Sequence, residues 1–265
     1  HYKNLLSLKE DKQLIHENFP KEITKADFEK LEILYKEIVK DDKIMAELEE
    51  IISFSLPKMK EHLHLKGFQA LGAAHRIDSG NVKVFAGELK GGVVNLSGKH
   101  GPTVLGTDNV MMAAVLAEGV TVIESAAAEP EVVDLANCLN SMGAKIEGAG
   151  TRRIIIEGVK ELHGTEHEVI PDRIEAGTYL AAGAIAGEKV TLKRVRPEHL
   201  GAVIDALRQA GYGIESNGDS MTIQGNGTPK SLNLRAEPYP GYPTDMQAQL
   251  WAVLCKWLGI SGMTE

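Results

Sequence analysis

The chain has 265 residues, of which 43% are hydrophobic and 25% charged, so it is long enough for one large globular domain or two modest ones. Its net charge of -8 argues against a nucleic-acid-binding protein, because such proteins normally present a basic face. No apolar run approaches the length that spans a bilayer and no secretion signal opens the sequence, so we expect no membrane association and a cytoplasmic location.

The two cysteines, Cys138 and Cys255, lie far apart and match no metal-binding or redox spacing. We expect both thiols to be reduced, buried and inert. No cluster of metal-ligating side chains is visible elsewhere in the sequence. We therefore expect neither a metal ion nor another cofactor.

Residues 1–62 form a segment of distinct composition. It contains no glycine and no arginine, whereas lysine and glutamate are frequent. Thr24 can cap a helix, and apolar residues then recur at helical spacing at Phe28, Leu31, Leu34, Ile38, Met45, Leu48 and Ile52. The pattern predicts charged amphipathic helices. Their polar side is either a solvated face or a surface for a partner, and the sequence leaves both interpretations open.

An internal repeat is the strongest structural signal of the remaining chain. AAVLAEGVTVIE recurs as AAGAIAGEKVTL, and LNSMGAKIE recurs as LRQAGYGIE; their glycines, Gly119 and Gly187 and then Gly143 and Gly211, each lie 68 positions apart. The repeating unit is predicted as helix, strand, helix, strand, strand. A partial copy precedes it (FQALGAAHRI with NVKVFAG) and another begins at DMQAQLWAVLCKWLG. We predict an α/β fold whose helices pack on one another with the sheets outside.

The stretch 100–119 contains a loop with Gly101, Pro102 and Gly106 that ends at Thr107 and Asp108. Both of these residues can cap a helix, which we predict over residues 109–118. Amide groups at the start of that helix could bind an anion such as a phosphate. A capped helix after a glycine loop is more often purely structural, and the loop matches neither the P-loop nor the dinucleotide fingerprint.

Three longer segments carry a family resemblance: residues 109–151, residues 169–185 (VIPDRIEAGTYLAAGAI) and residues 239–249 (YPGYPTDMQAQ). From about residue 64 onward the chain resembles the UDP-N-acetylglucosamine enolpyruvyl transferases (1-carboxyvinyltransferases, the MurA family) of peptidoglycan synthesis. The resemblance implies a fold of two lobes, each an inside-out α/β barrel of three such units, with the active site between the lobes. It also implies transfer of the enolpyruvyl group of phosphoenolpyruvate to the 3-hydroxyl of UDP-N-acetylglucosamine, with release of phosphate.

The same resemblance divides the chain into three parts: the helical segment 1–62, a lobe over 63–245, and the start of a truncated second lobe over 246–265. It also implies candidate substrate-binding residues. The diphosphate-binding turn of the family lines up with Thr103, Val104, Leu105, Gly106 and Thr107, although the glycine is displaced by one place. The other candidates are His64, Lys99, Glu129, Glu131 and Asp245. A packed histidine is an equal alternative for His64, and Glu129-Pro130-Glu131 could simply form the first turn of a helix.

Several family features are missing from the sequence. The segment before His64 lacks the expected loop cysteine and its arginine, and the second lobe, with its catalytic aspartate and phosphate-binding arginines, is not present. The resemblance therefore identifies no catalytic residue, and we expect the isolated chain to be inactive. The alternatives are a non-catalytic UDP-sugar-binding or protein-interaction module, a second chain that supplies the missing lobe, and a rearranged chain that exposes the apolar residues 250–260 and self-associates.

Overall fold

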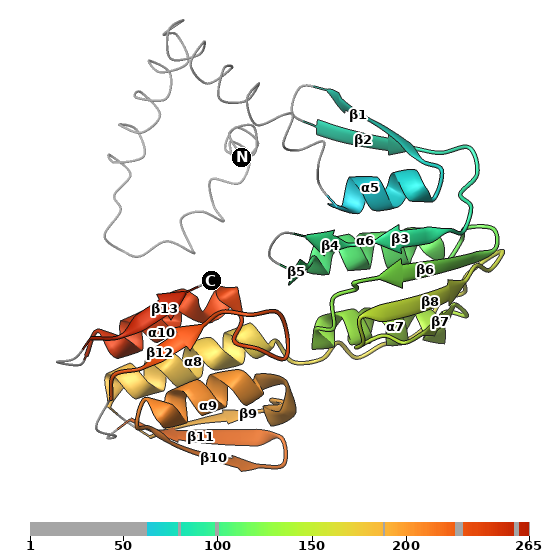
Figure 1. Ribbon diagram of the computed structural model, residues 1–265. Helices are drawn as coiled ribbons and strands as arrows, with labels where there is room; N and C mark the ends of the chain where they lie inside the picture. Colours follow the sequence, from blue (N-terminus) through green and yellow to red (C-terminus); the bar gives the residue numbers. More distant parts are fainter. Residues whose placement is uncertain are drawn as a thin grey trace, which may run out of the picture. The chain divides into compact units, whose positions relative to one another are not determined.

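The computed structural model describes residues 63–78, 81–98, 101–187, 189–225, 230–256 and 260–264 (Figure 1). The chain divides into two compact units, His1–Lys60 and Glu61–Glu265, and the described residues all belong to the second. The predicted helical segment 1–62 and the candidate Lys99 lie outside the described residues.

The predicted repeat is confirmed, since both copies have the order helix, strand, helix, strand, strand. The first copy consists of α6 (Val104–Ala114), β6 (Val120–Glu124), α7 (Pro130–Ser141), β7 (Lys145–Glu147) and β8 (Arg153–Glu157). The second copy consists of α8 (Arg173–Ala186), β9 (Lys189–Lys193), η1 (Pro197–Leu200), α9 (Gly201–Gln209), β10 (Gly213–Asn217) and β11 (Ser220–Gln224).

Partial copies flank the two complete ones. The first includes α5 (Leu63–Ala70), β1 (Ala74–Asp78) and β2 (Asn81–Phe85), and the short strands β3 (Val93–Asn95), β4 (Ser97–Gly98) and β5 (Gly101–Pro102) lead from it to α6. After the second complete copy come β12 (Asn233–Arg235), η2 (Thr244–Met246), α10 (Gln247–Leu254) and β13 (Gly262–Thr264). β12 and β13 pair in parallel.

The sheets are buried on one face only, as their alternating sequences predict. The first copy contributes to a four-stranded sheet of order β3-β6-β8-β7, and the second forms the antiparallel sheet β10-β11-β9. In β8, Ile154 and Ile156 are fully buried whereas Ile155 between them is exposed. The buried face of each sheet carries the helices of its own copy.

Left-handed backbone conformations recur at matching places of the two copies. Gly143 and Gly211, which follow the second helix of each copy, have φ of +99° and +98°, as predicted for glycines at helix C-termini. Ser125 and Arg194 follow the first strand of each copy and have φ of +55° and +57°. A left-handed non-glycine residue at the same place twice shows that the copies share backbone geometry, not only element order.

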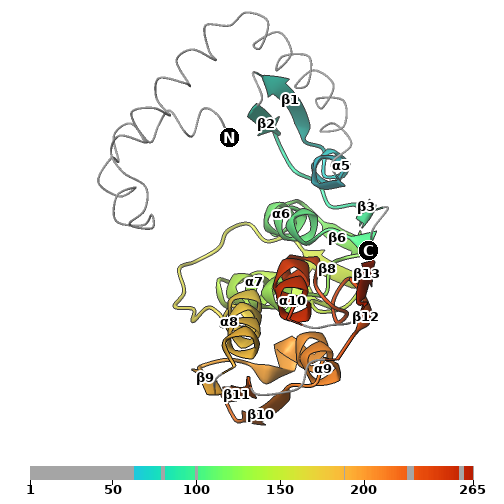
Figure 2. The ribbon, with the colours of Figure 1, turned by 90° about the vertical axis from the view of Figure 1, so that its left-hand side faces the viewer.

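The buried apolar side chains form two separate clusters. The first, which we call the first core, gathers residues between Leu71 and Ile156 and includes α6 and α7. The second core gathers residues between Ala176 and Leu254 and includes α8, α9 and α10. Helices α8 and α10 contact each other and lie side by side in two views (Figures 1 and 2).

The segment after residue 245 belongs to the second core. Leu250, Val253 and Leu254 are buried there, and α10 packs against α8. The alternative of a rearranged chain that exposes residues 250–260 is therefore wrong for these three side chains. Ile260 is exposed. The division of the chain at residues 245 and 246 stays a prediction.

Two further expectations concern the surface. Cys138 is half-buried and Cys255 is exposed, so the prediction that both thiols are buried is wrong; Cys255 directly follows the last residue of α10. Among the described helices, none combines the length and the apolar character that crossing a membrane requires.

Candidate functional site

The predicted anion-binding turn is the first turn of α6 rather than a loop that precedes it. Thr103 is the N-cap, and its Oγ1 accepts a hydrogen bond from the amide of Gly106 at 3.1 Å. The predicted helix start at residue 109 is therefore five residues too late, and the helix ends at Ala114 instead of residue 118. Thr103 caps the helix, rather than Thr107 or Asp108, because its hydroxyl reaches the free amide of Gly106, the third residue of α6.

The five candidate residues of this turn differ in accessibility. Leu105 is exposed, Thr103 and Val104 are half-buried, and Gly106 and Thr107 are buried. The hydroxyl of Thr107 donates to the carbonyl of Thr103 at 2.8 Å and accepts from the amide of Ala127 at 3.0 Å. Thr107 therefore joins α6 to the segment before α7, and the open part of the turn is limited to residues 103–105. No described residue accepts a hydrogen bond from the amides of Val104 and Leu105.

Replacing Thr107 with valine is expected to lower the free energy of unfolding by about 1–3 kcal/mol, because the buried amide of Ala127 loses its acceptor. Urea unfolding followed by circular dichroism measures the change. Thr191→Val is the control, since Thr191 is an exposed threonine of β9, and its effect should stay below about 0.5 kcal/mol. Equal effects of the two substitutions would show that the Thr107 hydroxyl has no structural role.

A group of three carboxylates lies where α6 meets the start of α7, and we call it the acidic cluster: Asp108, Glu129 and Glu131. Glu129 occupies the N-cap position of α7 and Pro130 its first turn, as the structural alternative predicts. The Glu129 side chain makes no capping hydrogen bond, and its residue is only 7% exposed. Glu129 Oε2 and Asp108 Oδ1 are both buried and have no hydrogen-bond partner among the described residues.

Replacing Asp108 with asparagine is expected to raise stability at neutral pH and to flatten its pH dependence. Burial, and then the charges of Glu131 and Glu129, raise the pKa of Asp108 from 3.8 to about 6. The folded protein thus keeps this proton to a higher pH than the unfolded chain, so ionisation of Asp108 costs stability as the pH rises from about 4 to 6. Because the group is only partly buried, we expect about 1 kcal/mol. A stability difference between wild type and variant that stays constant over this pH range would contradict the prediction.

Arg173, in the first turn of α8, connects the acidic cluster to the second core. Its Nη2 donates to Glu131 Oε1 at 2.8 Å and its Nε to Oε2 at 3.2 Å. Its guanidinium also lies over the ring of Tyr239, 5.6 Å from the ring centre. Burial alone would raise the pKa of Glu131, but the hydrogen bonds and charge of Arg173 outweigh burial and lower it. The same ion pair raises the pKa of Arg173 against the effect of its burial.

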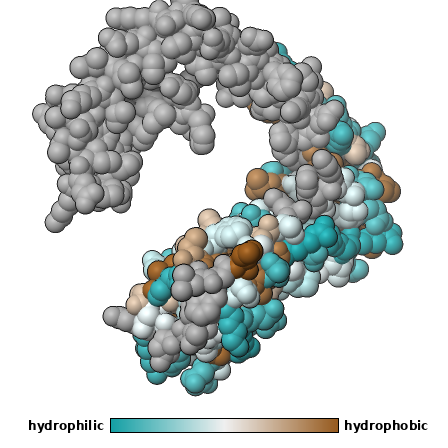
Figure 3. Space-filling view, turned by 60° about the vertical axis from the view of Figure 1, so that its left-hand side comes forward, coloured by the Kyte–Doolittle hydropathy of each residue, from teal (hydrophilic) through white to brown (hydrophobic). Residues whose placement is uncertain are grey.

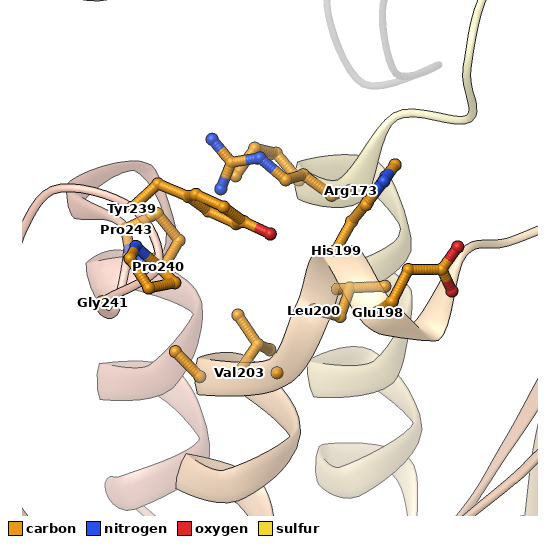
Figure 4. Close-up of a pocket in the computed structure, with 12 residues that line it drawn as sticks. Arg173, Glu198, His199, Leu200, Val203, Tyr239, Pro240, Gly241 and Pro243 are labelled. Atoms are coloured by element: carbon orange, nitrogen blue, oxygen red, sulfur yellow. The ribbon is translucent and has the colours of Figure 1, made fainter. Parts of the chain in front are cut away.

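A pocket of about 50 Å³ lies beside Arg173, and Figure 4 shows the Tyr239 hydroxyl pointing toward the side that carries His199. Burial lowers the pKa of His199, whose Nδ1 has no described partner. Leu200 and Val203 supply apolar walls. This pocket is too small to enclose a sugar nucleotide.

The remaining candidates in the described part of the chain are Asp245 and His64. Asp245 is exposed in η2 of the second core, and His64 belongs to α5, of which the structure describes only the backbone at this residue. The structure thus brings residues 103–107 together with the segment of Glu129 and Glu131 through the Thr107–Ala127 hydrogen bond. Sequence reasoning missed Asp108 as a partly buried acid and Arg173 as the partner of Glu131, although the PDRIEAGT motif contains Arg173. Among the described residues, no group of three or more histidines, cysteines or carboxylates could hold a metal ion.

The family model of EPSP synthase (3-phosphoshikimate 1-carboxyvinyltransferase) matches residues 61–265. The chain belongs to the EPSP synthase family. The predicted resemblance to enolpyruvyl transferases is therefore confirmed, and the match covers both complete repeats and both partial ones.

Two relatives that are similar to this chain are named UDP-N-acetylglucosamine 1-carboxyvinyltransferase. The protein of Akkermansia muciniphila is 60% identical over 202 residues, which is 75% of this chain and 48% of the relative. The protein of Methylacidiphilum infernorum is 49% identical over 203 residues, 77% of this chain and 48% of the relative. The chain thus spans about half the length of the curated relatives it matches.

Two solved structures of enolpyruvyl transferases share the fold. The enolpyruvyl transferase NikO from Streptomyces tendae superposes with a TM-score of 0.64 at 23% identity, covering 72% of this chain and 48% of that one. An EPSP synthase from Acinetobacter baumannii gives a TM-score of 0.53 at 22% identity, covering 76% of this chain and 47% of that one. The arrangement of repeats in this chain is therefore that of enolpyruvyl transferases.

Proposed function

We propose that this chain is part of an enzyme that transfers the enolpyruvyl group of phosphoenolpyruvate to UDP-N-acetylglucosamine, the first committed step of peptidoglycan synthesis. The observation that carries the proposal is the 60% identity over 202 residues to a relative with that name. The substrates are two anionic small molecules. A cytoplasmic location of the enzyme is part of the same proposal.

The proposed reaction is an addition followed by an elimination. The 3-hydroxyl of the sugar forms a C–O bond to C2 of phosphoenolpyruvate, while an acid protonates the methylene carbon and a base takes the hydroxyl proton. Loss of a proton from that carbon then expels phosphate and restores the double bond. Each step needs groups that hold two anions in reacting geometry.

We assign the diphosphate of the nucleotide to the open part of the α6 turn. This assignment is supported by the accessibility of the turn, in which Leu105 is exposed and Thr103 and Val104 are half-buried. The amides of Val104 and Leu105 lie at the N-terminus of α6, and amides in that position favour an anion. The exposed carboxylate of Asp245 can accept a hydrogen bond from a sugar hydroxyl. His64 and Lys99 remain candidate contacts by resemblance only. Glu131 is bonded to Arg173 and Glu129 is buried, so their contact with substrate stays a prediction.

Two measurements test the proposal. Phosphate release from phosphoenolpyruvate and UDP-N-acetylglucosamine should be absent with the 265-residue chain alone, because no thiol acid and no arginine of the expected loop precede His64. Isothermal titration with UDP-N-acetylglucosamine should nevertheless show saturable binding that Thr103→Ala weakens. Turnover by the pure chain would refute the first expectation, and absence of binding at millimolar nucleotide would refute the second.

The alternative is a non-catalytic module of the same descent that binds another protein. Exposed apolar side chains on the described surface favour this alternative, among them Leu105, Met112, Tyr179 and Trp251. Sedimentation of the pure chain separates the two proposals. Self-association without nucleotide binding would support the alternative, whereas co-purification with a chain that carries a second lobe would support the enzyme.

A further inference from the structure

The hairpin of β1 and β2 is the second half of a further copy of the repeat. In this copy and in both complete ones, a glycine with positive φ follows the helix, and the next residue donates a hydrogen bond to the carbonyl five positions earlier. The glycines are Gly72, Gly143 and Gly211, with φ of +87°, +99° and +98°. The three bonds measure 2.9, 3.0 and 3.0 Å. β1, β7 and β10 each begin two positions after the glycine, so β2 is the counterpart of β8 and β11.

In both complete copies the last strand pairs on its other edge with the first strand of the same copy. β8 lies between β7 and β6, and β11 lies between β10 and β9. β1 and β2 form a sheet of two strands, and no described strand pairs with the edge of β2 that faces away from β1 (Figure 1). We call it the outer edge of β2. An unpaired edge is a template for another strand.

The apolar side chains of β2 are more exposed than their counterparts in the complete copies. By the register of the hairpins, Val82 and Val84 correspond to two residues of β8, Ile154 and Ile156. Both isoleucines are fully buried, whereas the valines are 38% and 42% exposed. The counterparts in β11 are also fully buried: Met221 and Ile223. Apolar side chains interrupt the hydrophilic surface of the described residues in the space-filling view (Figure 3). A strand on the outer edge would cover part of the two valines.

The same correspondence identifies the amides that face the outer edge. In the first copy the amide of Gly158, two positions after Ile156, donates to the carbonyl of Gly119 on the β6 side at 2.9 Å. Residues two apart in a strand turn their amides to the same edge, so the amide of Ile156 also faces β6. The amides of Val82 and Val84 therefore face the outer edge of β2, where no described residue accepts a hydrogen bond from them.

The other face of the hairpin carries two adjacent basic residues. Arg76 and Lys83 are exposed and lie directly opposite each other in the register, and like charges in such a pair repel. In the first copy the first strand supplies an acid, since Glu124 of β6 lies opposite Arg153 of β8 and its Oε1 is 3.2 Å from the arginine Nε. A carboxylate opposite Lys83 would complement the hairpin in the same way. Two molecules of this chain paired through β2 would bring two basic pairs together, so charge favours a different polypeptide as the partner.

We propose that the outer edge of β2 binds an extended segment of a partner polypeptide as an added antiparallel strand. Alternate side chains of the segment are apolar and lie on the face of Val82 and Val84, and a carboxylate on the other face lies opposite Lys83. The orientation is that of β6 on β8 and of β9 on β11, which are both antiparallel. Main-chain hydrogen bonds supply affinity, and the alternation of side chains supplies specificity. The proposal goes beyond enolpyruvyl transfer and does not depend on it.

The test follows the backbone amides of Val82 and Val84 by NMR in the full chain. The probe is the peptide acetyl-Thr-Val-Glu-Ile-Thr-amide, which in antiparallel pairing places its valine and isoleucine beside the two valines and its glutamate opposite Lys83. It should shift both amide signals saturably and slow their hydrogen exchange about tenfold or more. The same peptide N-methylated at valine and isoleucine should not bind, because it lacks the amides that face β2. Lysine in place of glutamate should weaken binding about fivefold.

Four results of these measurements would overturn the proposal. The first is the absence of any shift with the glutamate probe, and the second is equal binding of the N-methylated peptide. The third is slow exchange of both amides in the free monomeric chain, which would mean that the outer edge is already paired. Sedimentation of the chain alone gives the fourth, because a dimer that the probe dissociates would assign the edge to a second molecule of this chain.

Variants of β2 separate main-chain pairing from the apolar surface. Val84→Pro removes one outward amide and should abolish binding, and proline is tolerated on the outer side of an edge strand. Val84→Thr is the matched control, since it keeps the amide and a β-branched side chain and should bind within about threefold of wild type. Circular dichroism of each variant verifies folding.

A charge reversal tests the predicted register. Lys83→Glu should reverse the preference between the glutamate and lysine probes, because the residue opposite the probe's central position changes sign. An unchanged preference in this folded variant would overturn the proposed pairing. If Val84→Pro is unfolded, the N-methylated peptide still tests main-chain pairing on the wild-type chain.

Discussion

Replacing Gly158 with alanine is expected to destabilise the first core by about 3 kcal/mol, the upper end of the range for inserting an atom into packed structure. A Cβ at this position would lie 1.6 Å from the carbonyl oxygen of Ala117. The backbone is held there on both sides, because the amide of Gly158 donates to Gly119 O at 2.9 Å and that of Val159 to Val115 O at 2.8 Å. Relief of the clash would require breaking these bonds, which join the end of β8 to the turn after α6.

Urea unfolding of Gly158→Ala and Gly164→Ala measures this effect. Gly164 is the matched control, since a Cβ there meets no atom within 4 Å. Both substitutions remove the same backbone freedom from the unfolded chain, so their difference isolates the clash. A Gly158→Ala variant as stable as the control would show that β8 does not approach α6 as closely as described.

The architecture could be predicted from the sequence because it repeats. Two copies with the same hydrophobic alternation and the same terminal glycines give the order of the elements twice, and Gly143 and Gly211 have the predicted positive φ. In β8 and β11 every second residue is buried, since the side chains of a strand alternate between its faces. Local signals of this kind need no knowledge of tertiary contacts.

The helix start shows where local reasoning fails. Thr103, Thr107 and Asp108 are all competent N-caps, and the sequence does not say which of them acts. In the structure, Thr107 instead bridges Thr103 and Ala127, a contact between residues 20 positions apart. Gly106 belongs to the turn that lines up with the diphosphate-binding turn of the family. A Cβ there would lie 2.2 Å from the Thr103 methyl group, so the capping position of Thr103 favours glycine.

The acidic cluster was beyond prediction for the same reason. Glu129 and Glu131 were candidates by resemblance, but the burial of Glu129 and the approach of Asp108 depend on the packing of α6 against α7. Arg173 is separated from Glu131 by 42 positions and belongs to the second repeat. Charge complementarity across repeats has no periodic signature, so only the structure shows which carboxylate is paired.

Arg173→Met is expected to lower the free energy of unfolding by about 2 kcal/mol, between the values typical of exposed and of buried ion pairs. The Arg173 side chain is 11% exposed and that of Glu131 45%, so solvent screens the pair only partly. Methionine keeps an unbranched apolar side chain but removes both hydrogen bonds to Glu131, the charge, and the cation–π contact with Tyr239. Urea unfolding of Arg173→Met, Glu131→Gln and the double variant gives the coupling energy, which should be about 1–2 kcal/mol.

The control cycle uses Lys145 and Glu157, an ion pair between neighbouring strands whose side chains are 59% and 58% exposed, and its coupling should be no more than about 0.5 kcal/mol. The pH dependence distinguishes the two cycles further. Because the pKa of Glu131 is lowered, its contribution is fully present above the unfolded value of about 4.5 and is lost as the pH falls through the folded value. Coupling between Arg173 and Glu131 should therefore vanish in acid. A coupling no larger than that of the exposed pair, or one that survives at low pH, would mean that the contact between the two repeats does not depend on this ion pair.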